Sequence, residues 1–274
     1  MNAENYFISL FAHSSGAIGD DGALVGSTVF SKDAFFEGVH FKRDWLSSEQ
    51  IAYKAMLVNI SDAIAMNARP KYALLSVAMP YAFPRAEMDA LNRGFARAAK
   101  EYGIEIIGGD TIGNIKLDIT VTIVSETKKP LLRKGLKKGD LLAYTGRLGK
   151  SGKALRYLMA GGRVHSRSKF VTTELRSDFI YAATDFLSCG MDISDGLFSD
   201  LGKLSEANRL GFRFKRCIGK RAGCSGEEYE MLIGFSPRER KKAVRYAQKS
   251  RTPLTLFARA VRGSYKNRCK AHHF

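Results

Sequence analysis

The sequence is poor in cysteine and lacks the spacings on which cysteine-based sites depend. Its four cysteines are Cys189, Cys217, Cys224 and Cys269, with no CxxC pair among them and no ligand spacing to the five histidines. Structural zinc sites and disulfide-rich secreted scaffolds both need such arrangements, so the sequence argues against these classes. Unpaired thiols in a chain of this size are more typical of a reducing compartment.

Long hydrophobic runs are also absent. No segment approaches the roughly 20 apolar residues of a membrane-spanning helix. The apolar stretch of residues 6–12 is too short for a signal peptide and is wrongly flanked, since Glu4 and polar residues precede it. Together with the free thiols, this predicts a cytoplasmic protein with no membrane partner.

Acidic residues are scarce compared with basic ones. Lysine and arginine number 44 against 27 aspartate and glutamate residues, which gives a formal net charge of +17. Such a surplus favours anionic partners, namely nucleotides, phosphorylated metabolites, nucleic acid or an anionic surface. Hydrophobic residues make up 45% of the 274 residues, enough for a full core in one large domain or two ordinary ones.

The order of helix and strand patterns predicts a mixed α/β (α+β) fold with two domains. In residues 1–136, short strands alternate with helices, and Ser47-Ser-Glu-Gln50 is a capping box that begins a helix ending before Pro70. The alternating strand of residues 117–123 closely follows another strand, which predicts antiparallel pairing in a mixed sheet with helices on one face. The Lys-, Pro- and Gly-rich segment 127–140 predicts a boundary before a C-terminal α/β domain of residues 137–274.

Several aspartates stand at strand ends or on a helix that should be buried: Asp21, Asp33, Asp62, Asp110, Asp192 and Asp195. If these carboxylates converge, each pair about 4 Å apart repels by about 4 kcal/mol at an effective dielectric near 20. Bound cations would make such an arrangement stable at neutral pH. Hard oxygen ligands without a His/Cys cluster favour Mg²⁺, which typically bridges protein carboxylates to substrate phosphates.

The aspartates differ in how well an ordinary structural role explains them. Asp195 precedes an amphipathic segment that starts at Leu197, so it could merely cap a helix. Asp192 lies in an apolar run, where an unpaired carboxylate is costly unless it meets a cation. Asp62 lies among Ile60, Ala63 and Ile64 of a helix interior that offers no backbone donor, which favours a metal or ligand contact.

A possible phosphate loop, Thr145-Gly-Arg-Leu-Gly-Lys-Ser151, does not meet the requirements of a P-loop. That motif needs a glycine five positions before the Gly-Lys pair, and Tyr144 stands there. Ordinary turn chemistry between a strand and a helix explains the glycines best. Anion binding at the N-terminus of the following helix is the alternative.

Two further groups each allow two interpretations. The acidic residues Glu227, Glu228 and Glu230 form either a solvated loop or a surface that faces a substrate. His40 is either structural or in contact with a substrate, and its place just beyond Asp33 favours the second. The basic segment 238–249 is better explained as a solvated amphipathic helix than as a nucleic-acid arm.

Taken together, the motifs resemble the thiamine-monophosphate kinase family, which belongs to the superfamily of aminoimidazole ribonucleotide synthetase and selenophosphate synthetase. The matching motifs appear in family order over most of the chain: Ile18-Gly-Asp-Asp21, Ser31-Lys-Asp33, Glu37-Gly-Val-His-Phe41, Ala52-Tyr-Lys-Ala55 with Asn59-Ile-Ser-Asp62, Ile107-Gly-Gly-Asp-Thr111, Asp192-Ile-Ser-Asp-Gly-Leu197 with Ser199-Asp-Leu-Gly202, and Gly226-Glu-Glu-Tyr-Glu230. The resemblance implies a mixed-sheet N-terminal domain, an α/β C-terminal domain and a homodimer. It also implies that ATP phosphorylates thiamine monophosphate to thiamine diphosphate.

The resemblance further implies a role for each matching residue. The magnesium ligands would be Asp21, Ser31, Asp33, Asp62, Asp110, Asp192 and Asp195, with Lys32 at a position where the family commonly has a metal-binding threonine. Gly109, Asp110, Arg133 and Ser194 match positions that contact ATP. His40 and Glu227 match positions near the thiamine phosphate. The catalytic centre would be Asp33, Asp62, Asp110 and Asp192, which hold the ions that align an in-line transfer.

The sequence departs from the family at Lys32, whose backbone carbonyl could still serve if its side chain points elsewhere. The segment between Phe214 and Glu227 is short, and residues 271–274 resemble the family's aromatic terminus only loosely.

Two rival functions remain: another ATP-dependent enzyme of the superfamily, such as a ring-closing synthetase or maturation factor, and a basic RNA-binding protein. The set of acidic motifs argues against RNA binding, so no nucleic-acid partner is expected.

Overall fold

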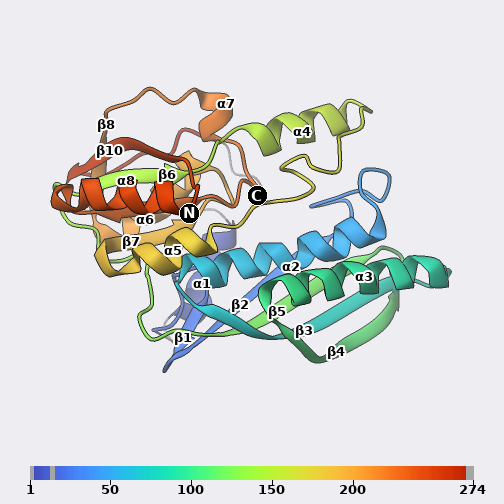
Figure 1. The fold of residues 1–274 in the computed structure, drawn as a ribbon. Coiled ribbons are helices and arrows are strands. Elements are labelled where there is room, and N and C mark those ends of the chain that lie inside the picture. The colour runs from blue at the N-terminus through green and yellow to red at the C-terminus, as the bar shows by residue number, and fades with distance from the viewer. Residues whose placement is uncertain (1–2, 13–15, 270–274) are drawn as a thin grey trace.

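Two five-stranded sheets organise the chain, in a computed structural model that describes residues 3–12 and 16–269 (Figure 1). The first sheet has the order β1-β2-β5-β3-β4, from strands β1 (Ala23–Val25), β2 (Thr28–Phe36), β3 (Arg69–Pro80), β4 (Glu105–Asn114) and β5 (Asp118–Glu126). The second has the order β7-β9-β6-β10-β8, from β6 (Leu141–Thr145), β7 (Leu187–Asp192), β8 (Leu210–Phe214), β9 (Met231–Phe235) and β10 (Leu254–Arg262). Residues 271–274, compared above with the family's terminus, lie outside the described residues.

The first sheet is mixed, as the sequence predicted, but its pairing is different. Strands β3 and β4 are parallel, while β5 runs antiparallel to both β2 and β3. The predicted pair of successive strands, β4 and β5, are therefore not neighbours, because β3 lies between them. Two strands, β5 and β3, separate β2 from the edge strand β4.

One face of the first sheet carries helices α2 (Ser48–Ala65) and α3 (Arg85–Tyr102), which lie side by side (Figure 1). The predicted capping box at Ser47 is present, with Gln50 completing it. A Cβ on Gly94 would stand 2.2 Å from the Glu49 carbonyl oxygen, so glycine allows α3 to approach α2 closely. Helix α2 is buried along almost its whole length, because it also contacts β7 of the second sheet.

In the second sheet, each pair of neighbouring strands is antiparallel. Around it lie the longer helices α4 (Lys150–Met159), α5 (Ser177–Ala183), α6 (Leu197–Asn208) and α8 (Arg240–Lys249). Shorter elements are α7 (Lys220–Gly223) and the 3₁₀ turns η1 (Thr184–Phe186) and η2 (Pro237–Glu239), and helix α1 (Ala3–Ala12) precedes the first sheet in the chain. No helix in the described ranges is long and apolar enough to cross a membrane.

The cysteines are not all unpaired, and that expectation was wrong. Cys224 and Cys269 form a disulfide across 45 residues of sequence. Cys189 is buried and free, and Cys217 is exposed and free. The bond was missed because the two partners are far apart in sequence, and β8 and β10 bring their segments together only in the folded second sheet.

Candidate active site

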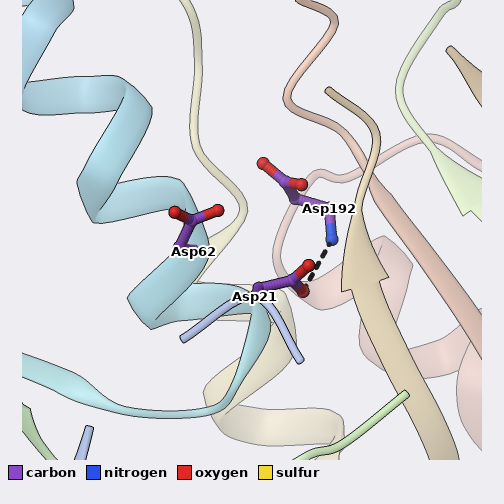
Figure 2. Close-up of side chains that lie close together, drawn as sticks. All are labelled: Asp21, Asp62 and Asp192. Carbon is purple, nitrogen blue, oxygen red and sulfur yellow. Dashed lines mark hydrogen bonds between the residues drawn. The ribbon is translucent and has the colours of Figure 1, made fainter. Parts of the chain in front are cut away.

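Three aspartates from distant parts of the chain meet in one cluster (Figure 2). Asp21 lies in the loop before β1, Asp62 on α2, and Asp192 at the end of β7. One carboxylate oxygen from each lies within 4.8 Å of the others. The sequence predicted that these residues would converge, and the structure brings them together.

Hydrogen bonds hold the cluster in place. The Ser61 hydroxyl donates to Asp192 Oδ2 at 2.7 Å, which ties α2 to β7. The backbone N–H of Asp192 donates to Asp21 Oδ2 at 3.3 Å, the contact drawn in Figure 2. These bonds fix the directions of the Asp192 and Asp21 carboxylates.

Asp33 extends the cluster from β2. Its carboxyl group shares a hydrogen bond with Asp62, and it lies on the same face of the strand as Ser31, whose hydroxyl donates to the Asn59 carbonyl at 3.0 Å. The side chain of Lys32 lies on the opposite face and donates to the Thr120 and Thr122 hydroxyls at 3.2 and 3.4 Å. Only the backbone of Lys32 is therefore in a position to face the cluster.

The carboxyl groups of the cluster resist ionisation together. The pKa values of Asp62 and Asp192 are raised well above their usual range, first by desolvation and then by neighbouring carboxylates. Burial also raises the pKa of Asp33, although its hydrogen bond with Asp62 lowers it. Burial raises the pKa of Asp21 as well, and the Arg133 guanidinium opposes this. Added positive charge would be needed to ionise the whole set at neutral pH.

Arg133 is the cation closest to Asp21. Its guanidinium forms an ion pair with Asp21 Oδ1, including a hydrogen bond from Nε at 3.1 Å. Its backbone N–H donates to Asp20 Oδ1 at 2.6 Å. The residue that the resemblance assigned to ATP thus stands beside the cluster.

Lys203 is a second cation, which the sequence analysis missed. Its Nζ lies 2.6 Å from Asp195 Oδ2 and 3.1 Å from Asp200 Oδ1. The spacing of three between Asp200 and Lys203 on α6 was the available signal. The N-cap of α6 is Gly196, which has no side chain, and Asp195 lies one residue before it.

Asp110 and Gly109 lie outside the cluster, on the exposed edge strand β4. The Asp110 carboxylate accepts a hydrogen bond from the Thr111 N–H at 2.8 Å. A Cβ on Gly109 would stand 1.7 Å from the Leu75 carbonyl oxygen, so only glycine allows β4 to approach β3 this closely. The structure does not bring Asp110 to Asp33 within one chain.

The acidic cluster that follows Gly226 is not a solvated loop. Glu228 and Glu230 are buried, at 0% and 1% exposure, and Glu227 forms an ion pair with Lys54. Glu228 Oε1 accepts from the backbone N–H groups of Gly149 and Ser151 at 2.7 and 3.2 Å. Its carboxylate therefore fills the N-terminus of α4, where the sequence left anion binding open as an alternative.

Glu230 belongs to a buried ion-pair network. Its carboxylate pairs with the Arg176 guanidinium at 2.8 Å and with Lys169 Nζ at 2.7 Å, and it accepts from the Thr145 hydroxyl at 2.8 Å. These cations lower the pKa of Glu230 although burial opposes them. The network fixes the segment that carries Glu227.

His40 and Ser194 flank this region. His40 Nδ1 accepts a hydrogen bond from the Phe36 N–H at 3.0 Å, and its ring stacks on Phe35 with centroids 5.6 Å apart. The Ser194 carbonyl accepts from the Glu227 N–H at 2.6 Å. This hydrogen bond joins the segment of Ser194, predicted to contact ATP, to the segment of Glu227, predicted to lie near the thiamine phosphate.

The donor set suits a hard divalent cation. Carboxylate oxygens from Asp21, Asp62 and Asp192 converge, and Asp33 adds another, with no thiolate or imidazole in the group found among the described residues. The Asp200 carboxylate on α6 is buried as well, and its Oδ1 forms the ion pair with Lys203 at 3.1 Å. Crowded oxygen donors with raised pKa values are the chemistry expected of a site for Mg²⁺.

The family model described as AIR synthase related protein, N-terminal domain, matches residues 19–127 of the chain. Thiamine-monophosphate kinase of Bacillus subtilis is 35% identical over 208 residues, which cover 70% of this chain and 64% of that protein. The kinase of the same name from Buchnera aphidicola is 30% identical over 256 residues, 82% of this chain and 78% of that protein. The solved structure of AaThiL complexed with AMPPCP and TMP matches with a TM-score of 0.87 at 25% identity, over 100% of this chain and 99% of that one.

The chain therefore belongs to the thiamine-monophosphate kinase family. The family resemblance inferred from the ordered motifs is confirmed, as is the mixed α/β fold class. Membership also argues against the rival functions, a different enzyme of the superfamily or an RNA-binding protein.

Proposed function

We propose that this protein transfers the terminal phosphoryl group of ATP to thiamine monophosphate, giving thiamine diphosphate. It is a thiamine-phosphate kinase with a phosphate group as acceptor, and ATP is its co-substrate. The observation that carries the proposal is the convergence of Asp21, Asp62 and Asp192, within a chain that belongs to this kinase family. Two anionic substrates require such a site, because their negatively charged phosphates repel each other when they are brought together.

We assign the divalent-cation site to Asp21, Asp33, Asp62 and Asp192, with Ser31 beside them and the Lys32 carbonyl at its edge. When bound there, Mg²⁺ would neutralise phosphate oxygens and hold them for in-line transfer. Asp195 is a further ligand only if it exchanges its ion pair with Lys203 for a metal. Arg133 and Ser194 are the nucleotide contacts that a single chain supplies at the cluster.

No general base is required for the reaction. The acceptor is a phosphate oxygen, which is largely ionised near neutral pH because its second pKa is about 6. The chain contributes by positioning the substrates and by balancing charge. Arg133 and Lys203 supply fixed positive charge next to the carboxylates. The transfer is direct, without a phosphoenzyme intermediate.

We propose that the acceptor lies towards His40 and Glu227. The Glu227 side chain is 23% exposed, so its carboxylate can reach a ligand while it is held from behind. His40 accepts a backbone hydrogen bond through Nδ1, which leaves Nε2 as the nitrogen that carries the proton of a neutral ring. These two residues are proposed to contact thiamine monophosphate.

We also propose that the protein is a homodimer, and the place of Asp110 supports this. In the first sheet, β5 and β3 separate β2 from β4, so Asp33 and Asp110 of one chain stand about 14 Å apart at 4.8 Å per strand. The two can share one site only if Asp110 comes from a second copy. The open face of this sheet also carries exposed apolar side chains, with Phe30 40%, Tyr72 42% and Ile112 58% exposed.

The two-domain division at about residue 136 remains a proposal. One cluster of buried side chains lies within residues 136–260, whereas the larger cluster includes residues from both halves of the chain. The active site would then lie where α2 of the first half meets β7 of the second.

The function is tested by incubating the protein with Mg-ATP and thiamine monophosphate and measuring thiamine diphosphate by chromatography. Product should form only when all three components are present, in equal amount to ADP. ATP hydrolysis without thiamine diphosphate would contradict the proposed acceptor. Labelled phosphate trapped covalently on the protein would contradict direct transfer.

A further inference from the structure

A buried lysine connects the two halves of the chain beside the proposed acceptor site. Lys54 lies on α2, its side chain is 1% exposed, and its Nζ lies 2.6 Å from Glu227 Oε2. Glu227 is the only hydrogen-bond acceptor that the described residues offer this ammonium group. A buried charge is tolerated only with a partner of this kind, so the contact is specific.

Aromatic rings cover the rest of the ammonium group. Lys54 Nζ lies 3.7 Å from the centroid of the Phe170 ring and 5.7 Å from that of Phe35. Ring faces attract cations, and this attraction is directional. Phe35 also stacks on His40, so Phe35 and Lys54 link the two residues proposed to contact the acceptor.

Glu227 needs such support, because its backbone is in an unfavourable conformation. Its φ is +54° and that of Tyr229 is +48°, in the left-handed region that residues with a side chain rarely adopt. The backbone is held by the N–H of Glu227, which donates to the Ser194 carbonyl at 2.6 Å, while Tyr229 N–H donates to Ile193 at 2.9 Å. The carboxylate itself is held by Lys54.

Lys54 cannot act on the transferred phosphoryl group itself. It precedes Asp62 by eight residues on α2, which places the two about 12 Å apart along the helix axis. Its side chain is also closed off from solvent, whereas that of Glu227 is 23% exposed. Any effect on the reaction must therefore pass through Glu227.

We propose that Lys54 is a positioning residue for the acceptor: it fixes the direction of the Glu227 carboxylate and so determines affinity for thiamine monophosphate, leaving phosphoryl transfer itself unchanged. The inference rests on the proposed function and adds to it a residue that does not touch the substrate. Helix α2 then contributes to both proposed sites, since Asp62 belongs to the cation site and Lys54 to the acceptor site.

The test compares steady-state kinetics of Lys54→Met, Glu227→Gln and the double variant, with each substrate varied separately. Loss of a hydrogen bond between charged groups predicts a KM for thiamine monophosphate about 10- to 100-fold higher in all three variants. The double variant should be no worse than the single ones, because the two residues act through one contact. In Lys54→Met, the KM for ATP and kcat should stay within about twofold of wild type.

Lys100→Met is the matched control, since Lys100 is an exposed lysine near the end of α3. If Lys54→Met does not fold, the double variant provides the test, because it leaves no buried charge unpaired. An unchanged KM for thiamine monophosphate in either variant would overturn the inference, as would equal changes for both substrates. Wild-type protein without thiamine monophosphate turnover would instead overturn the proposed function, and the inference with it.

Discussion

The Ser61 hydroxyl donates a hydrogen bond of 2.7 Å to Asp192, which joins α2 to the end of β7 across 131 positions of sequence. Asp62 is the next residue on α2, so this one contact places two carboxylates of the cluster beside each other. The proposed cation site is therefore assembled by the packing of the buried helix against the second sheet. Its geometry depends on the whole fold rather than on a flexible loop.

Replacing Asp62 should separate function from stability. Asp62→Asn removes one charge from a crowded group, so we expect kcat to fall at least about 100-fold while the metal-free protein becomes more stable, on the order of 1 kcal/mol. Activity assays and denaturation in EDTA measure the two effects. Asp89→Asn, an exposed aspartate on α3, is the control and should change neither. Equal loss of activity and stability would indicate a merely structural residue.

The metal-free protein should become less stable as the pH rises. Burial raises the pKa of Asp200 to about 7, and the pKa values of Asp33, Asp62 and Asp192 are also raised. These groups bind protons more tightly when the protein is folded, so their contribution is full below the ordinary value of 3.8 and is lost as pH rises through about 7.

Urea denaturation at pH 5 and pH 8 in EDTA, at about 0.15 M salt, checks this expectation. Saturating Mg²⁺ should restore stability at the higher pH, since cations favour the ionised carboxylates. The free energy of unfolding should decrease less steeply with pH in Asp200→Asn. Stability that rises with pH in wild type and variant alike would be inconsistent with the raised pKa values.

Lys203 should stabilise the protein when no divalent cation is present. Lys203→Met leaves Asp200 buried without its ion-pair partner, and we expect a loss of about 1–3 kcal/mol in EDTA. We expect the loss of stability to lie at the lower end of this range, because the lysine side chain is 37% exposed. Lys203→Arg, which keeps the charge, should lose less. The free energy of unfolding, measured with and without Mg²⁺, provides the comparison.

The proposed dimer predicts that two inactive variants restore each other. Asp33→Asn and Asp110→Asn should each be inactive alone, but a mixed dimer would contain one site with both aspartates. Random exchange of subunits makes half of the dimers mixed, each with one intact site of two, so about a quarter of wild-type activity should return. Unfolding and refolding the mixture, followed by the kinase assay, measures it.

The control for this experiment is a variant that cannot dimerise. Ile112→Asp places a charge on the open face of the first sheet, where Ile112 is 58% exposed, and should give a monomer by light scattering. When Ile112→Asp is added to both Asp33→Asn and Asp110→Asn, the mixture of these two proteins should recover no activity. Full activity in that monomer would show that one chain supplies a complete site.

Much of the fold could be predicted from local signals. The capping box at Ser47 marked the start of α2, and the alternating pattern of residues 117–123 marked strand β5. The aspartates of the cluster stood out because a carboxylate within an apolar pattern lacks a simple structural explanation, as at Asp62. The family's ordered motifs added the roles of these residues.

Other features depend on contacts that no local pattern encodes. The strand order of the first sheet places β3 between β4 and β5, although these two follow each other in sequence. Lys54 resembles any lysine on a helix until Glu227, 173 positions later, is found beside it. The pairing of Cys224 with Cys269 likewise follows from the tertiary fold alone.

Calorimetric titration of the metal-free protein with Mg²⁺ at neutral pH, in wild type and in Asp62→Asn, tests the central claim most directly. The convergence of carboxylates predicts saturable binding to wild type, with proton release, and binding at least about tenfold weaker in the variant. Absence of binding to wild type, or the same affinity in both proteins, would contradict the assignment of this cluster as the cation site of the kinase.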